Sequence, residues 1–203
     1  MRKLIVASNN KNKIIEIKEI LKECNIDVVS LKEENISIEV EEDGKTFKEN
    51  SCKKAKEIKD YLTNKGNHDF IVMADDSGIT IDALKGAPGV YSARYAGEPC
   101  DPEKNNDKVL LELKNVPWDQ RTAQFVCHIT LLDSGGKEFH VEGVVGGRVT
   151  EERIGTGGFG YDPIFYIDQY KKTFGQLSSD EKNKISHRAK ALAKAKEIIK
   201  DLV

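Results

Sequence analysis

The sequence predicts an α/β fold with a mixed β-sheet flanked by helices. The chain opens with a short apolar segment, residues 4–7, followed by a segment with helical spacing of apolar side chains. Residues 70–74 are apolar throughout, which is typical of a strand buried on both faces. Residues 122–132 alternate between apolar and polar side chains, turn at residues 133–136, and return as a strand over residues 139–149. Strand–helix units followed by a hairpin favour a sheet with parallel and antiparallel neighbours.

Caps and apolar faces predict the helices. The first helix follows residues 4–7 and has an apolar face formed by Ile14, Ile17, Ile20, Leu21 and Cys24. Thr46 and Glu49 form a capping-box pattern for a second helix, whose predicted face is Phe47, Ser51, Ala55, Ile58 and Leu62. Asp101 and Pro102 are typical of a helix start, and this helix runs toward Leu113. A short strand is expected at residues 79–81. The last helix has an apolar face of Ala189, Leu192, Ala195, Ile199 and Leu202.

Composition narrows the class of protein. The chain has 203 residues, of which 38% are hydrophobic and 33% charged, and its formal net charge is −2. This balance argues against binding nucleic acid through bulk positive charge, and no segment approaches the ~18 apolar residues of a membrane-spanning helix. We expect a single domain over residues 1–203 that consists of two lobes. Because the N-terminus lacks a signal-peptide core, we also expect a cytoplasmic location, with neither nucleic acid nor membrane as partner.

The cysteines show no metal-binding spacing. They form no Cys-x-x-Cys pair, and no histidine lies at zinc-ligand spacing from any of them; they are Cys24, Cys52, Cys100 and Cys127. The sequence therefore predicts reduced thiols and no structural zinc site.

Two phosphate-binding motifs are present only in part. Residues 44–46 resemble the end of a P-loop, but Glu39 stands where the first glycine is required. Residues 155–160 contain the spacing G-x-G-x-x-G, but Pro163 follows closely, where a dinucleotide site needs a helix N-terminus. We expect neither a P-loop nor a Rossmann site, and we interpret the glycines as allowing a close approach of the backbone.

A polar segment between the first strand and the first helix is suited to anions. Exposed backbone N–H groups at a helix start favour negative charge, and the side chains here add donors. The segment consists of Ser8, Asn9, Asn10, Lys11, Asn12 and Lys13. It is a candidate site for a triphosphate tail, and an ordinary polar helix cap with solvated lysines remains an alternative.

Two carboxylates follow the apolar segment at residues 70–74. Asp75 and Asp76 are expected at the carboxyl end of a buried strand, where open α/β sheets bind ligands. A simple turn formed with Ser77 and Gly78 is an equal alternative. An acidic loop with Glu41, Glu42 and Asp43 could add oxygen ligands for Mg²⁺, although such loops are usually just solvated.

A third candidate group combines an aromatic loop with distant basic residues. Phe159 could stack on a nucleobase, and Lys182, His187 and Arg188 could donate hydrogen bonds to ring oxygens. The alternative is that the basic residues only decorate a lysine-rich helix.

Several of these segments form an ordered set of motifs between residue 4 and about residue 192. The motifs are SNNKNK at 8–13, EDGKTF at 42–47, ADDSG at 74–78, LKGAPGVYSARYAG at 84–97, GTGGFGYDPIF at 155–165 and EKNKISHR at 181–188. Together they resemble the inosine triphosphate pyrophosphatase family, which hydrolyses ITP, dITP and XTP. The resemblance implies an elongated mixed sheet in two lobes, a nucleotide cleft between the lobes, and a homodimer.

The resemblance also implies residue roles. Asp76 would act as the base on the attacking water, supported by Asp75, and Glu42 with Asp76 would bind Mg²⁺. Phosphates would be held by Ser8, Asn9, Asn10, Lys11, Asn12, Lys13 and Lys54, with Ser77 also at the substrate. The base would be held by Phe159, Gly160, Tyr161, Asp162, Lys182, His187 and Arg188.

The expected reaction is Mg²⁺-dependent hydrolysis of a deaminated purine nucleoside triphosphate to the monophosphate and pyrophosphate, which would cleanse the nucleotide pool. Donors in a base pocket suit a 6-oxo purine and mismatch the 6-amino group of adenine. Two alternatives stay open: a Maf-type pyrophosphatase acting on modified or pyrimidine nucleotides, and a binding module without catalysis. The carboxylates Asp75 and Asp76 disfavour the binding module, and the tail around His187 and Arg188 favours the purine enzyme.

Overall fold

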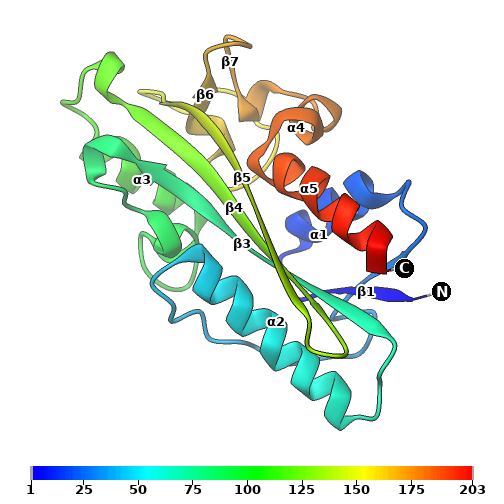
Figure 1. The fold of residues 1–203 in the computed structure, drawn as a ribbon. Coiled ribbons are helices and arrows are strands. Elements are labelled where there is room, and N and C mark those ends of the chain that lie inside the picture. The colour runs from blue at the N-terminus through cyan, green and yellow to red at the C-terminus, as the bar shows by residue number, and fades with distance from the viewer. Residues whose placement is uncertain (1, 203) are drawn as a thin grey trace. The chain divides into compact units, whose positions relative to one another are not determined.

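A computed structural model describes residues 2–202 (Figure 1). In this part of the chain one sheet has the strand order β2-β1-β3-β4-β5-β6-β7. The strands are β1 (Lys3–Val6), β2 (Asp27–Ser30), β3 (Phe70–Ile81), β4 (Thr122–Asp133), β5 (Glu138–Val149), β6 (Phe165–Ile167) and β7 (Lys172–Thr173). The α-helices are α1 (Lys11–Leu21), α2 (Phe47–Asn64), α3 (Pro102–Glu112), α4 (Ser179–Ile185) and α5 (His187–Leu202). Strand β1 is parallel to β2 and β3, whereas β6 is antiparallel to β5 and β7, so the predicted mixed sheet is confirmed.

The chain divides into two compact units, and the long strands β3, β4 and β5 each contribute to both. The first unit consists of Met1–Asp76, Cys127–Gly143 and Arg188–Val203. The second consists of Ser77–Val126 and Val144–His187. The nucleotide cleft expected between two lobes stays a prediction.

The first unit has helices on both faces of its strands. Leu4 and Val6 of β1 pack in a cluster with residues of α1 and α5, whereas Ile5 packs in a second cluster with residues of α2. In Figure 1, α2 lies on one side of β1 and β3 while α1 and α5 lie on the other. Because successive strand residues face opposite sides, burial on both faces requires a continuous apolar run, as the sequence has at residues 70–74.

The second unit has its own aromatic core. The Phe125 ring meets the Phe165 ring edge-on, with centroids 4.6 Å apart, and stacks on Phe174 at 5.8 Å. Val109 of α3 and Leu113, which follows that helix, pack in the same cluster.

The helix caps follow the sequence predictions closely. Thr46 caps α2 by accepting a hydrogen bond from the Glu49 backbone N–H at 3.1 Å. The Glu49 carboxylate accepts from the backbone N–H of Lys45 at 2.6 Å, one residue before the position that a capping box prescribes. Asp101 caps α3 through the N–H groups of Glu103 and Lys104.

The expectation that a strand ends at Ala74 and another begins at Ile79 is wrong, because β3 is continuous over Phe70–Ile81. Asp75 and Asp76 therefore lie inside the strand rather than at its carboxyl end, and the turn alternative is also excluded. Gly78 allows the close approach that holds this stretch extended: a Cβ there would lie 2.3 Å from the Ser92 hydroxyl oxygen. That hydroxyl also accepts a hydrogen bond from the Ile79 N–H at 2.9 Å.

Short elements were not predicted from the sequence. They are β2, β6, β7 and α4, each of seven residues or fewer. Such segments are too short to show a clear hydrophobic period. Among the described residues, no helix combines the length and hydropathy needed to cross a bilayer, and the four cysteines are free thiols.

Candidate active site

The two adjacent carboxylates of β3 lie in different surroundings within the first unit. Asp75 is fully buried, and its Oδ1 accepts a hydrogen bond from Lys13 Nζ of α1 at 2.7 Å. Its Oδ2 accepts from Arg188 Nε of α5 at 2.8 Å and from the Cys127 thiol at 3.1 Å. Arg188 also donates to Glu16 of α1 at 2.5 Å. Asp75 thus ties α1 and α5 to the central strand.

These cations fix the charge of Asp75. Burial alone would raise the pKa of Asp75, but the charges of Arg188 and Lys13 outweigh it and hold the pKa well below its usual value. Asp75 is consequently an anion that neighbouring cations neutralise. This arrangement suits a residue that positions the site rather than one that exchanges protons.

Asp76 points to the opposite side of β3, toward α2, as the alternation of a strand requires. Its Oδ2 accepts a hydrogen bond from Asn50 Nδ2 at 3.0 Å, and its Oδ1 lies 3.8 Å from Lys54 Nζ. Burial raises the pKa of Asp76, and the nearby charge of Lys54 offsets this only in part. Asp76 therefore accepts a proton more readily than an ordinary aspartate, which is a property that a general base needs.

Glu42 shares a cation with Asp76. Lys54 Nζ donates to Glu42 Oε1 at 2.5 Å and to the backbone carbonyl of Asp75 at 2.8 Å. A positive group thus already lies within 4 Å of both carboxylates. Two carboxylates near one another are the hard oxygen ligands that Mg²⁺ prefers, so these residues fit a magnesium ion.

The residues of the polar segment before α1 differ in their contacts and in their exposure to solvent. Asn10 caps the helix, since its Oδ1 accepts from the N–H groups of Asn12 and Lys13 at 3.0 and 3.1 Å. Lys13 forms an ion pair with Asp75. The exposed members of the segment are Asn9, Asn10, Lys11 and Asn12, and Ser8 is half-buried. Its exposed donors surround a helix start, which is compatible both with a cap and with an anion site.

A separate group forms in the second unit. Lys182 Nζ of α4 donates to Asp162 Oδ2 at 2.5 Å, and the Phe159 N–H donates to the same oxygen at 2.7 Å. The Lys182 ammonium also lies 4.5 Å from the centre of the Phe159 ring. Gly158 has φ of +72°, and a Cβ there would lie 2.0 Å from Asp162 Oδ2. The expected close backbone approach in the glycine-rich loop is therefore present.

The remaining predicted residues make contacts of their own, apart from the group formed by Lys182, Asp162 and Phe159. The Tyr161 hydroxyl donates to the Ser92 carbonyl at 2.7 Å, and the Gly160 carbonyl accepts from Asn106 Nδ2 at 3.0 Å. His187 is buried and stacks on Phe125 at a centroid distance of 4.6 Å. Half-buried Ser77 follows Asp76 in β3. Among the three predicted base donors, the structure places Lys182 with Phe159, His187 against Phe125, and Arg188 with Asp75.

Sequence reasoning missed several residues that hold the carboxylates. Asn50 lies one helical turn before Lys54, so their shared face of α2 could have indicated that both reach the same carboxylate. Glu16 lies three residues after Lys13 on α1. No local sequence pattern could have indicated the contact of Cys127 with Asp75, because the two residues are 52 positions apart.

Comparisons with known proteins agree with this architecture. The chain matches the model of the Ham1 family over residues 4–198. It is 56% identical over 203 residues to the dITP/XTP pyrophosphatase of Clostridium perfringens, covering 100% of both chains. It is 50% identical over 200 residues to that of Desulforamulus reducens, covering 98% of this chain and 96% of the relative.

Two solved structures give the same result. The Staphylococcus aureus Ham1 protein superposes with a TM-score of 0.86 at 38% identity, covering 100% of each chain. A nucleoside-triphosphatase / dITP/XTP pyrophosphatase from Mycobacterium abscessus gives a TM-score of 0.74 at 37% identity, covering 95% of this chain and 98% of the other. With its motifs, fold and carboxylate pair all in place, this chain belongs to the Ham1 family.

Proposed function

We propose that this protein is a nucleoside triphosphate pyrophosphatase that hydrolyses ITP, dITP and XTP to the monophosphate and pyrophosphate. The observation that carries the proposal is the pair of buried carboxylates in β3, one neutralised by Lys13 and Arg188 and the other with a raised pKa. Relatives at 56% and 50% identity bear the name dITP/XTP pyrophosphatase. A module that only bound nucleotides would gain nothing from a buried carboxylate with a raised pKa.

Asp76 is the residue to which we assign the proton transfer. Burial raises its pKa, and the Asn50 amide fixes the orientation of its carboxylate. A base must be oriented toward the proton that it accepts, so Asn50 is assigned as its positioning residue. Asp75 supports the same strand through its ion pairs with α1 and α5.

Glu42 and Asp76 are the residues that would hold Mg²⁺. Bound there, Mg²⁺ would supply positive charge that stabilises phosphate oxygens and the leaving pyrophosphate. The ammonium of Lys54, which already contacts Glu42, adds positive charge on the same side of β3. The exposed donors at the start of α1, Asn9, Asn10, Lys11 and Asn12, are assigned to the phosphates.

Recognition of the base is assigned to the second unit. Phe159 offers an aromatic ring for stacking, and Lys182 offers a cationic donor held by Asp162. A 6-oxo group can accept from such a donor, whereas the 6-amino group of adenine cannot, and a mismatched polar group leaves donors unpaired at about 1–3 kcal/mol each. We keep His187 of the second unit, and Arg188 at the start of the last segment of the first unit, as predicted contributors.

The proposed function is tested by product analysis. Purified protein is incubated with Mg²⁺ and, separately, with ITP, dITP, XTP, GTP, ATP and pyrimidine triphosphates, and pyrophosphate, orthophosphate and nucleotides are quantified. We expect pyrophosphate and the monophosphate in one step, with ITP and XTP cleaved far faster than ATP. Orthophosphate with a nucleoside diphosphate would exclude the reaction. A preference for pyrimidine substrates would support the Maf-type alternative, and binding without turnover would support the binding module.

Assembly and location complete the proposal. We propose a homodimer acting in the cytoplasm, with a purine nucleoside triphosphate as its small-molecule partner. Light scattering of the purified protein and fractionation of the source cells test these two statements separately from the reaction.

A further inference from the structure

A group of potential metal ligands lies on the first unit among residues that the proposed reaction does not use. Cys52 of α2 and Glu138 and His140 of β5 each offer one ligand atom, and these atoms lie within 4.8 Å of one another. Cys52 Sγ is 3.2 Å from Glu138 Oε1 and 3.9 Å from His140 Nδ1. His140 Nε2 is 3.1 Å from the same Glu138 oxygen. All three side chains are half-buried or at the surface.

We propose that Cys52, Glu138 and His140 form a binding site for a borderline-soft divalent transition metal, represented by Zn²⁺. Thiolate, imidazole and carboxylate are the ligands that zinc takes in proteins, whereas Mg²⁺ prefers oxygen alone. Zinc bond lengths in a tetrahedral arrangement place ligand atoms about 3.3–3.6 Å apart. Cys52 Sγ and Glu138 Oε1 are 3.2 Å apart, which is close to this spacing. The two nitrogens of His140 each lie near one of them, Nε2 at 3.1 Å from the Glu138 oxygen and Nδ1 at 3.9 Å from the sulfur. One ligand atom from each residue, within 4.8 Å of the others, can therefore approach a common metal ion after a small adjustment of the side chains.

Neighbouring groups already orient the ligands. Lys56 Nζ lies 3.1 Å from Glu138 Oε2, which turns Oε1 toward Cys52 and His140. Thr130 Oγ1 of β4 lies 3.3 Å from His140 Nδ1 and 3.6 Å from Cys52 Sγ. Such outer contacts fix ring and carboxylate orientation in metal sites. These contacts hold the three proposed ligands close together in the metal-free protein.

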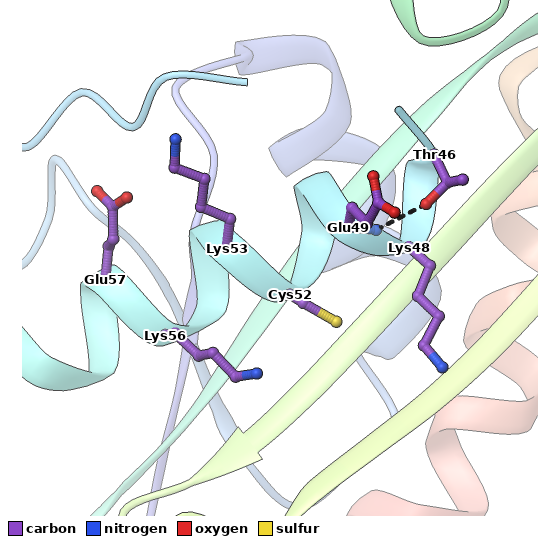
Figure 2. A pocket seen from close by; sticks show the side chains of 7 residues that line it. All are labelled: Thr46, Lys48, Glu49, Cys52, Lys53, Lys56 and Glu57. Carbon is purple, nitrogen blue, oxygen red and sulfur yellow. Dashed lines mark hydrogen bonds between the residues drawn. The ribbon is translucent and has the colours of Figure 1, made fainter. Parts of the chain in front are cut away.

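A surface pocket of about 600 Å³ lies beside the Cys52 end of the site (Figure 2). Its lining residues are Thr46, Lys48, Glu49, Cys52, Lys53, Lys56 and Glu57. Figure 2 shows the Cys52 and Lys56 side chains leaving α2 on the same side, away from Lys53. The pocket exposes the Cys52 side of the site to solvent, and the Glu138 and His140 side chains are themselves partly exposed, so a metal ion can enter and water can take a fourth ligand position.

Binding changes the state of the thiol. Burial raises the pKa of Cys52, and Glu138 beside it acts in the same direction, so the metal-free site holds a thiol whose S–H donates to Glu138. When the metal binds, the S–H bond breaks, the proton passes to bulk water, and the sulfur forms the metal bond without any change of oxidation state. The metal then joins α2 to β5. Because Asn50 and Lys54 of α2 hold Asp76, this link fixes the helix that positions the proposed base.

The test uses Co²⁺ as a spectroscopic probe and needs no assay of activity. The whole protein, reduced with a phosphine, is titrated with Co²⁺ while the thiolate-to-cobalt absorption band is followed. We expect one equivalent to bind, displacement by Zn²⁺, and no displacement by excess Mg²⁺. Zn²⁺ should also raise the melting temperature, since a ligand that binds only the folded state stabilises it.

Variants assign the site. Cys52→Ser should abolish the band, and His140→Gln should weaken Co²⁺ binding by at least about tenfold. Cys100→Ser is the matched control, because Cys100 is an exposed cysteine of the second unit and should leave the titration unchanged. Metal-free melting curves check that each variant is folded. A wild-type protein without the band, or an undiminished band in Cys52→Ser, would overturn the proposal.

Discussion

Asp75 and Asp76 are chemically identical neighbours, yet the two sides of β3 give them opposite properties. On the side of α1 and α5, Asp75 is neutralised by Lys13 and Arg188, and its pKa lies well below the usual value. On the side of α2, Asp76 has an amide and a more distant ammonium, and its pKa is raised. The pleat of a strand sorts adjacent residues to different sides, and the helices on each side then decide the charge state. Asp75 is thereby held as an anion, whereas Asp76 takes up a proton more readily than an ordinary aspartate.

The largest expected effect is a loss of stability when the ion pair between Arg188 and Asp75 is removed. Arg188→Ala removes one of the two cations that pair with the fully buried Asp75 carboxylate. Breaking a buried ion pair in this way typically costs about 3–5 kcal/mol of unfolding free energy. Urea denaturation monitored by circular dichroism measures it. Arg153→Ala is the control, since Arg153 forms surface ion pairs with Glu103 and Asp107 worth at most about 1 kcal/mol. Equal losses of unfolding free energy in the two variants would contradict a structural role for the ion pairs of Asp75.

The next effect is on catalysis and belongs to the Asp76 side. Asp76→Asn should lower kcat by at least about 10²-fold, because the amide cannot accept the proton of the attacking water. Steady-state release of pyrophosphate from ITP measures it, with circular dichroism as a check on folding. Asp60→Asn, an exposed position on the same helix as Asn50, should retain wild-type kcat. Near-normal turnover of Asp76→Asn would remove this residue from the mechanism.

A third prediction separates chemistry at β3 from recognition in the second unit. Lys182→Met should reduce the ratio of kcat/KM for ITP over ATP by about tenfold, because one donor to the 6-oxo group, worth about 1–3 kcal/mol, is lost. Asp76→Asn should lower kcat/KM for ITP and for ATP by the same factor and so leave their ratio unchanged. Lys184→Met, at an exposed position of α4, is the control. A ratio that moves with Asp76 and not with Lys182 would contradict this division.

The smallest effect concerns stability on the Asp76 side. A carboxylate whose pKa is raised on folding lowers the stability of the protein at neutral pH, because the folded state disfavours its ionised form. In Mg²⁺-free buffer, Asp76→Asn should therefore melt at or above the wild-type temperature at pH 7. This difference should shrink as the pH is lowered and Asp76 takes up its proton. A variant that melts well below the wild type at pH 7 would show that ionised Asp76 stabilises the fold.

Local patterns were sufficient for much of the fold. The caps Thr46 and Asp101, the apolar faces of the helices and the turn at residues 133–136 each depend on contacts within a few positions of the chain. The ordered motifs likewise indicated the family and the candidate residues, including Asp75, Asp76 and Glu42. These features are readable because helix periodicity, strand alternation and capping are short-range rules.

Tertiary structure alone decided the rest. Asp and Gly disfavour strands, so sequence predicted a break after Ala74, but packing against Ser92 and cations from other elements keep β3 continuous. Arg188 was expected at the base, and its ion pair with Asp75 spans 113 positions. The group formed by Cys52, Glu138 and His140 spans up to 88 positions and had no recognisable spacing. Charges and ligands so far apart in sequence meet only when the sheet and helices pack, and that packing sets their burial and hence their chemistry.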